Sequence, residues 1–279
     1  MREIERCITE TAASIEEITG NIKANANVRP NFPTASWWRD KVHIALVGGG
    51  PSLGSQIEEL KDKTKYRYVM ACGAVHDYLV EQGVIPDFCA IVDPDPIVIK
   101  YILKPCKDTL YLVASQCSPK VFEHLDEHGC QVYMWHADGG PLSDKEKADL
   151  FGEGTALVGG GCTIGTRAMI LAIGMGFFNQ DLFGFDTCLT NDYKHHVFDF
   201  HDPNVETVGN IVEIKLGGSD SPTFKVAEYM LGQLFDFKNI LRAFANCLNV
   251  TVHGGGLLAK LMEIGFSRID EVNKNGSAT

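Results

Sequence analysis

No stretch of this sequence is apolar for long enough to cross a membrane. The longest apolar run, residues 169–178, is about half of the roughly 20 residues that a membrane-spanning helix needs. The opening residues, Met-Arg-Glu-Ile-Glu-Arg, lack the apolar segment of a secretory signal peptide. We therefore expect a cytoplasmic protein without a membrane partner.

Paired cysteines are missing as well. None of the nine cysteines stands in a Cys-x-x-Cys pair, which argues against a zinc ribbon. An odd number of cysteines without an export signal fits a reducing compartment. We expect most of these cysteines to be small buried apolar side chains.

Basic residues are outnumbered in this chain. Its 25 Lys and Arg face 36 Asp and Glu, which gives a formal net charge of −11. This charge argues against nucleic acid as a partner, unless a local basic groove provides the contact. With 45% hydrophobic and 22% charged residues, the 279-residue chain has the composition of a globular protein.

The chain divides near residue 40. Isoleucines recur at helical spacing through residues 1–28, and prolines and asparagines follow them. We expect residues 1–40 to form an N-terminal helical arm that packs on the protein or joins two copies into a homo-oligomer. Residues 41–279 are expected to form one domain.

Short apolar strands alternate with helices in this domain, which predicts a Rossmann-like, doubly wound α/β fold with a mostly parallel sheet. Ligands of such folds bind at the carboxyl ends of the strands. We also expect a buried helix over residues 164–175, a polar loop over 187–222 and a long helix over 224–244. The predicted strands are 42–47, 68–71, 88–92, 110–114, 132–135, 181–185 and 248–252.

Two glycine-rich turns each lead from a strand region into a helix, and both are predicted to bind the phosphates of a nucleotide. Glycine lets the backbone approach a phosphate, and the helix N-terminus offers free N–H groups. The first turn is neither a dinucleotide fingerprint nor a P-loop, so a tight turn capped by Ser52 is the alternative. Cys72 and Gly73, at the end of another strand, are expected to line the same site. The nucleotide-binding candidates in the two turns are Gly48, Gly49, Gly50, Pro51, Ser52, Gly160, Gly161, Cys162 and Thr163.

An Asp-Pro-Asp-Pro segment follows the strand predicted at residues 88–92. Asp93 and Asp95 at a strand end are candidate ligands for Mg²⁺ that bridges a diphosphate, and Asp93 is also a candidate nucleotide contact. The alternative is a turn rich in aspartate and proline.

A further strand ends in Gly184-Phe185-Asp186, and histidines follow it. Histidine is the side chain best suited to move protons near pH 7. Asp186 with either His195 or His196 is therefore the candidate catalytic group, with His201 as a third choice, and Gly184 is a candidate nucleotide contact.

These strand ends, in this order, resemble the 6-hydroxymethylpterin diphosphokinase-like family, which includes the motility-associated factors that glycosylate flagellin. The resemblance rests on residues 48–53, the Gly-x-x-Pro-Asp segment at 83–87, Asp93, residues 159–163 and 184–186, and the following histidines. It covers roughly residues 41–260 and implies a nucleotide site at these strand ends.

The first turn and the Gly-x-Asp strand end also resemble the bacterial CMP-sialic-acid-dependent sialyltransferases. That resemblance implies a nucleotide held by the glycine-rich turns and a histidine that deprotonates an acceptor hydroxyl. This chain has Gly49 and Gly73 where those enzymes carry asparagine.

Three functions follow from these patterns. The first is a glycosyltransferase that uses a UDP- or CMP-linked sugar, with a histidine base acting on an acceptor hydroxyl. The second is a diphosphokinase that acts on a pterin-like alcohol with ATP and Mg²⁺. The third is a nucleotide-binding module without catalytic activity.

Overall fold

The main sheet of the computed structural model has eight strands, and every neighbouring pair is parallel. The structure describes residues 13–26, 29–31, 42–198, 210–216 and 221–265. Strand order is β10-β7-β1-β2-β3-β4-β5-β6. The predicted α/β, Rossmann-like fold is confirmed. The strands are β1 (His43–Val47), β2 (Tyr68–Cys72), β3 (Phe88–Ile91), β4 (Leu110–Ala114), β5 (Gln131–Ala137), β6 (Leu157–Val158), β7 (Asn179–Phe183) and β10 (Asn249–Val252).

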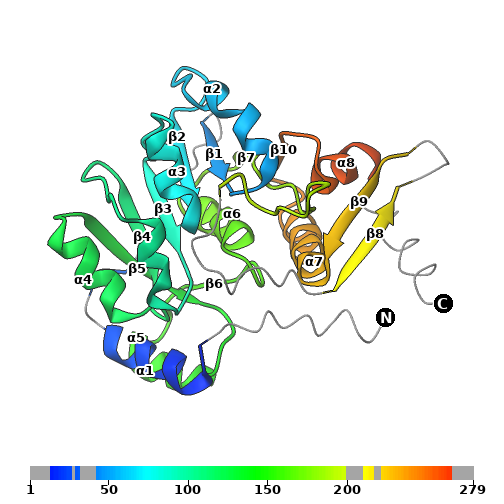
Figure 1. Ribbon diagram of the computed structural model, residues 1–279. Helices are drawn as coiled ribbons and strands as arrows, with labels where there is room; N and C mark the ends of the chain where they lie inside the picture. Colours follow the sequence, from blue (N-terminus) through cyan, green and yellow to red (C-terminus); the bar gives the residue numbers. More distant parts are fainter. Residues whose placement is uncertain (1–12, 27–28, 32–41, 199–209, 217–220, 266–279) are drawn as a thin grey trace.

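Helices cover the sheet, as Figure 1 shows. Because both faces are covered, the central strands are almost wholly apolar, and Leu46, Met70 and Val113 are fully buried. The helix predicted at 164–175 is α6, which packs against β1, β2 and β3. The α-helices are α1 (Ile15–Asn25), α2 (Ile57–Leu60), α3 (His76–Glu81), α4 (Pro119–Glu127), α5 (Asp144–Phe151), α6 (Ile164–Gly174), α7 (Glu228–Ala243) and α8 (Leu257–Ile264).

The strand order reverses beside β1. From β1 the chain moves outward through β2 to β6, and then α6 brings it back to β7 on the other side of β1. This reversal is the topological switch point at which open α/β sheets bind their ligands. The turns that follow β1 and β7 are therefore neighbours at the place where a ligand is expected.

The helix of the predicted N-terminal arm packs on the chain's own body. Asn25, 2% exposed, donates from its amide nitrogen to the carbonyls of Ser115 and Cys117 at 2.9 and 2.7 Å, just beyond β4. The Ser14 hydroxyl and Glu17 form a capping box at the start of α1. The predicted arm begins at residue 1, but residues 1–12 and 32–41 lie outside the described part of the chain. Its role in a homo-oligomer stays a prediction.

Two boundaries predicted from the sequence are wrong. The predicted loop 187–222 contains strand β8 (Ile211–Lys215), and the start of the predicted helix 224–244 is strand β9 (Thr223–Ala227). The two strands form an antiparallel hairpin beside α7 (Figure 1). Ile214, Phe224 and Val226 are buried, and this two-residue spacing identifies a strand rather than a helix.

The strand predicted at 181–185 is β7, and it begins and ends two residues earlier than predicted. Gly184 ends it because its φ of +65° leaves the extended region of the backbone. Strand β6 and helix α5 were missed. A capping box of Ser143 and Glu146 marks the start of α5, so the signal for this helix was present in the sequence.

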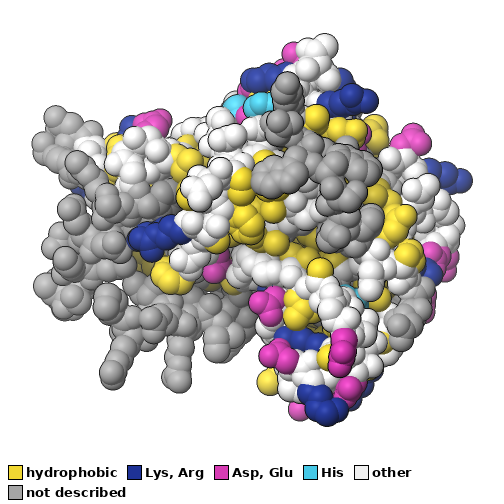
Figure 2. All heavy atoms as spheres, turned by 180° about the vertical axis from the view of Figure 1, so that it is seen from behind, with side chains coloured by type: hydrophobic (Ala, Val, Ile, Leu, Met, Phe, Trp, Pro, Cys, Tyr) yellow, Lys and Arg dark blue, Asp and Glu magenta, His cyan; other side chains and the backbone are white. Residues whose placement is uncertain are grey.

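Among the described residues that Figure 2 shows on the rear face, Lys and Arg form no continuous patch. Hydrophobic side chains gather near its middle, and Lys and Arg are scattered among acidic residues toward its margins. That nucleic acid is no partner stays a prediction from the net charge. Within the described ranges, every helix is too short or too polar to cross a bilayer.

A buried histidine joins the N-terminal segment to the sheet at β5. His136 is 2% exposed, stacks on Phe151 at 3.6 Å between ring centroids, and lies 3.1 Å through Nε2 from the side-chain Oδ1 of Asn31. An amide oxygen only accepts, so Nε2 carries the proton. Burial lowers the pKa of His136 to about 4. His136 also borders a cavity of about 180 Å³ with Arg29, Asn31, Met134 and Phe151, four strands away from β1.

This histidine is expected to make the protein acid-sensitive. The pKa of His136 is 6.5 in the unfolded chain and about 4 in the folded protein. Between these pH values the unfolded chain binds a proton at this residue and the folded protein does not. Stability is therefore full above pH 6.5 and is lost at up to about 1.4 kcal/mol per pH unit between pH 6.5 and about 4. Urea denaturation at pH 7 and pH 4.5 tests this. His136→Gln keeps a donor for Asn31 and should lose less stability between the two pH values than the parent does. An equal loss in both proteins would assign the acid sensitivity to other groups.

Candidate functional site

The turns that follow β1 and β7 interlock at the switch point. The Gly48 N–H donates to the Phe183 carbonyl at 2.8 Å, and the Gly50 N–H donates to the Gly184 carbonyl at 2.9 Å. A Cβ on Gly50 would lie 2.5 Å from the Gly184 oxygen and would overlap the Asp186 carboxylate. The first glycine-rich turn (residues 48–52) therefore uses its glycines to approach the neighbouring turn, in addition to any approach to a ligand.

Asp186 lies at the centre of these turns. It is 7% exposed, and its Oδ2 accepts the Ser52 N–H at 3.0 Å at the start of the 3₁₀ turn η2 (Pro51–Ser55). Burial raises the pKa of Asp186, and the Ser52 N–H and hydroxyl oppose this shift. The Ser52 hydroxyl forms no hydrogen bond of normal geometry and is buried. The first turn is thus capped by the Asp186 carboxylate, from the turn after β7, and the alternative of a cap by the Ser52 side chain is wrong.

A third glycine-rich turn, at residues 254–256 after β10, covers this centre. A Cβ on Gly256 would lie 2.5 Å from the Asp186 Cα, and a Cβ on Gly254 would lie 2.7 Å from the Ser52 Oγ. The Leu258 N–H donates to the Asp186 carbonyl at 3.3 Å. Sequence reasoning ended the last strand at this turn without assigning it a role, because its partners lie far away in the chain.

A hydrogen-bonded layer next to these turns anchors the covering turn. Asp181, on β7, lies 2.7 Å from His43 Nδ1 and 2.9 Å from His253 Nε2. Burial raises the pKa of Asp181, but the hydrogen bonds from His253 and His43 outweigh burial and lower it. His253 also stacks on Phe183 at 4.1 Å between centroids and directly precedes Gly254. These contacts hold the turn against Ser52 and Asp186.

The second glycine-rich turn (residues 159–163) opens α6, as predicted. Gly160 and Gly161 have φ values of +105° and +85°, and Thr163 caps the helix by accepting the Thr166 N–H at 3.3 Å. The Cys162 N–H donates to the carboxylate of Asp236, on α7, at 2.8 Å. Sequence reasoning missed Asp236, because nothing in a helix marks which distant turn one of its carboxylates will reach.

Cys72 and Gly73 bring the end of β2 to the start of α6. Gly73 has a φ of +59°, and a Cβ there would lie 3.8 Å from the Cγ2 of Ile164, the first residue of α6. Cys72 is 6% exposed, and burial raises the pKa of its thiol to about 12. The thiol is therefore protonated near pH 7, which fits a small lining residue and not a nucleophile.

The Asp-Pro-Asp segment has two different carboxylates. Asp95 caps the 3₁₀ turn η4 (Pro96–Tyr101) by accepting the Ile97 N–H at 2.8 Å. Asp93 accepts the Asp95 N–H at 3.0 Å and keeps solvent access, although protein atoms crowd around it. This partial burial raises the pKa of Asp93, and the charge of Asp95 adds to the effect. Among the described residues, no cluster of three or more His, Cys, Asp or Glu could hold a metal ion.

The histidine segment folds back onto the first glycine-rich turn. The Val197 N–H donates to the Gly49 carbonyl at 2.8 Å, and His196 Nδ1 lies 3.2 Å from the same oxygen. The His196 ring is parallel to that of Phe198 at 5.1 Å and lies 4.1 Å from the His195 ring, both measured between centroids. Burial, and then the charge of His195, lower the pKa of His196 to about 3. Burial also lowers the pKa of His195. His201 lies outside the described residues.

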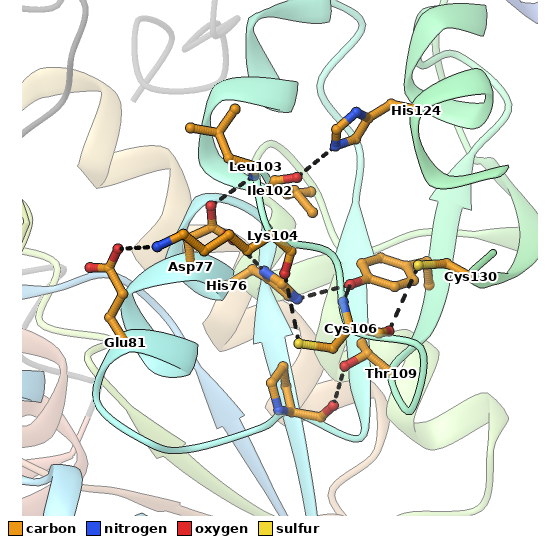
Figure 3. A network of polar contacts seen from close by, with 12 residues as sticks. His76, Asp77, Glu81, Ile102, Leu103, Lys104, Cys106, Thr109, His124 and Cys130 are labelled. Carbon is orange, nitrogen blue, oxygen red and sulfur yellow. Dashed lines mark hydrogen bonds and ion pairs between the residues drawn. The ribbon is translucent and has the colours of Figure 1, made fainter. Parts of the chain in front are cut away.

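A second buried network, missed in the sequence, joins α3 to the segment before β4 and is drawn in Figure 3. His76, the fully buried first residue of α3, lies 2.8 Å from Asp77 Oδ1 through Nδ1 and 2.9 Å from the Tyr111 hydroxyl through Nε2. The Tyr111 oxygen accepts the Cys106 N–H, and Asp77 accepts the Leu103 N–H at 2.7 Å. Each of these polar groups has a partner, so the network holds the segment before β4 against α3 and has a structural role.

The fold and these strand ends define an α/β protein with its candidate site at the sheet's switch point. Residues 16–192 match the family described as 6-hydroxymethylpterin diphosphokinase MptE-like. The match spans more than half of the chain, so this protein belongs to the MptE-like family. The family resemblance inferred from the sequence is confirmed.

Among solved structures, the chain is similar to the MAf glycosyltransferase from Magnetospirillum magneticum AMB-1. The TM-score is 0.67 at 17% sequence identity, over 87% of this chain and 37% of the other. The chain thus spans little more than a third of the length of that protein, and the likeness is one of fold. No curated protein matches the sequence at a significant level. Family membership supports a transferase, and similarity to sialyltransferases stays a prediction.

Proposed function

We propose that this protein is a nucleotide-dependent glycosyltransferase in which His196 is the general base toward an acceptor hydroxyl. The observation that carries the proposal is the contact between His196 and Gly49. It sets an imidazole against the glycine-rich turn at the switch point, where a donor nucleotide is expected. Family membership supports a transferase, and the fold is shared with a known glycosyltransferase.

The contact with Gly49 also defines the protonation state of the imidazole. A carbonyl oxygen only accepts, so Nδ1 of the neutral His196 ring carries the proton and Nε2 is the nitrogen that can accept one. The low pKa of His196 keeps the ring neutral near pH 7. An anionic donor bound nearby would raise this pKa and make Nε2 a stronger base.

The nucleotide is expected to lie along the ends of β1 and β2 and the start of α6. The residues proposed to contact it are those predicted from the sequence, with Asp186 between the turns. Both turns already bind a carboxylate, Asp186 at Ser52 and Asp236 at Cys162. A phosphate at either turn would therefore have to displace or neutralise a carboxylate, and this favours contact through the nucleoside or sugar there.

Asp93 favours the second candidate function, a Mg²⁺-dependent diphosphokinase that uses ATP. Its carboxylate follows β3, two strands from β1, and is accessible to solvent. With no larger ligand cluster among the described residues, Mg²⁺ would take its other ligands from phosphate and water, as Mg²⁺ does in nucleotide sites. Asp95 fits this role less well because it caps η4.

A nucleotide screen with and without Mg²⁺ tests these alternatives. Thermal denaturation is followed with UDP, CMP, GDP and ATP, each in Mg²⁺ and in excess EDTA. We expect a nucleoside mono- or diphosphate to raise the melting temperature in EDTA as well as in Mg²⁺, because ligands that bind only the folded state stabilise it.

Asp93→Asn serves as the matched variant in the same screen. For the glycosyltransferase we expect its Mg²⁺ response to equal that of the parent. The opposite result is that ATP is the one nucleotide that stabilises the parent, that it does so only in Mg²⁺, and that Asp93→Asn abolishes this response. The diphosphokinase is then the better proposal for the function. If no nucleotide stabilises the parent, both functions are wrong.

A further inference from the structure

Thr187, the residue directly after Asp186, has a backbone conformation that its side chain disfavours. Its φ is +52°, in the left-handed region that glycine and asparagine adopt at little energetic cost and in which a β-branched residue is an outlier. Among the described non-glycine residues only Tyr193 shares a positive φ, and it lies in an exposed turn. Thr187 is instead 5% exposed and lies at the switch point.

The hydroxyl of Thr187 is buried without a hydrogen-bond partner among the described residues. Buried polar groups are nearly always paired, so an unpaired one calls for an explanation. The side-chain oxygen of Gln56, in the segment that follows the first glycine-rich turn, is another buried atom without a partner among the described residues.

A purely structural turn does not account for this combination. Glycine would relieve the backbone, and valine would fill the same volume without an unpaired hydroxyl. A strained backbone that persists at a site is a device for holding one group in place. Here the group held is the hydroxyl of the residue that directly follows Asp186, and a hydroxyl together with a carboxylate suits neutral hydroxyl ligands better than an anion.

We propose that Thr187, with Asp186 and Ser52, forms a subsite for the hydroxyl groups of a sugar ring in the donor. The Asp186 carboxylate accepts from a ring hydroxyl, and the Thr187 hydroxyl donates to or accepts from its neighbour. The Thr187 side chain is buried in this structure, so binding requires a local shift that uncovers its hydroxyl. This inference deepens the proposed function and rests on it.

Three substitutions of Thr187 separate the hydroxyl from the backbone. Thr187→Val removes the hydroxyl and keeps the branched shape, Thr187→Ser keeps the hydroxyl, and Thr187→Gly removes both the hydroxyl and the strain. Binding is measured by calorimetry with CMP, UMP, AMP and GMP and their 2′-deoxy forms, and with UDP-glucose and UDP.

We expect the parent to prefer a ribose or a glucose hydroxyl by roughly tenfold in affinity, the value of one hydrogen bond. Thr187→Val and Thr187→Gly should lose that preference, and Thr187→Ser should keep it. Thr187→Gly should also melt at a higher temperature than the parent without ligand. If Thr187→Val loses the preference for ribose over 2′-deoxyribose nucleotides, the subsite binds the nucleoside. If it loses the preference for UDP-glucose over UDP, the subsite binds the transferred sugar.

The proposal is overturned if Thr187→Val keeps the parent's preference in both series, or if the parent has no preference in either. In those cases nucleotides still bind, and the proposed function stands without this subsite. If no nucleotide or nucleotide sugar binds the parent, the proposed function and the subsite fail together.

Discussion

Replacing His196 with alanine is expected to lower turnover by about 10²–10⁴-fold, the usual contribution of a general base. The residue is fixed against Gly49 through Nδ1, which leaves Nε2 as the basic nitrogen, and its surroundings keep it unprotonated. Substrate binding should change far less than turnover, because the interaction matters mainly in the transition state. Turnover and substrate affinity, measured separately with the donor found in the nucleotide screen, check this.

Two matched variants make the His196 experiment specific. His196→Asn offers an amide N–H to the Gly49 carbonyl but no base, so it should preserve folding and lose turnover as alanine does. His195→Ala should be nearly silent, because the contact with the first glycine-rich turn belongs to its neighbour. Equal and small effects in both alanine variants would move the base elsewhere, with His201 as the next residue to test.

The pH profile provides an independent check on the same residue. A base must be unprotonated to act, and the pKa of His196 is about 3 in the folded protein without ligand. The acid limb of kcat/KM, which reports the free enzyme, is therefore expected well below pH 6.5. An acid limb centred near 6.5 that disappears in His195→Ala would assign the base to His195.

The sequence was sufficient for the fold class because strand patterns are local. The strands of the sheet centre are mostly apolar, as residues 44–47 with Ile, Ala, Leu and Val show. Strand order is not local, however, and it determines which residues meet at the candidate site. That β7 returns beside β1 puts Asp186 against Ser52, 134 residues apart, and no spacing in the sequence shows this.

The same limit explains which site residues were missed. Neither Asp236 nor Thr187 lies in a recognisable motif. Asp236 matters because it contacts Cys162, 74 residues away, and Thr187 matters because of its positive φ. The hairpin of β8 and β9 is a different case. Its alternating apolar residues and the Gly-Gly-Ser-Asp-Ser-Pro link at 217–222 were visible in the sequence. The apolar residues of the helix that follows continue the apolar pattern of the hairpin. The change in their spacing, from every second residue to a helical repeat, was therefore overlooked.

The glycines of the first turn were predicted to leave room for a phosphate, and the structure changes what their substitution should do. We expect Gly50→Ala to destabilise the protein by about 3 kcal/mol or more, above the usual cost of overpacking. The added carbon would meet the Gly184 carbonyl at 2.5 Å and the Asp186 carboxylate, and neither can retreat because each is hydrogen-bonded in the interlocked turns. Gly50→Val should fail to fold.

Gly159→Ala is the matched control for Gly50→Ala. Gly159 belongs to the second glycine-rich turn, has no positive φ, and no atom lies within 4 Å of a Cβ added there. Its substitution should change stability by less than about 0.5 kcal/mol, as at an unconstrained site. Urea denaturation of the three proteins, followed by the fluorescence of the buried Trp135, measures both differences. If Gly50→Ala is as stable as the parent but no longer binds nucleotide, the glycine serves the ligand directly, and the interlocked turns contribute little to folding.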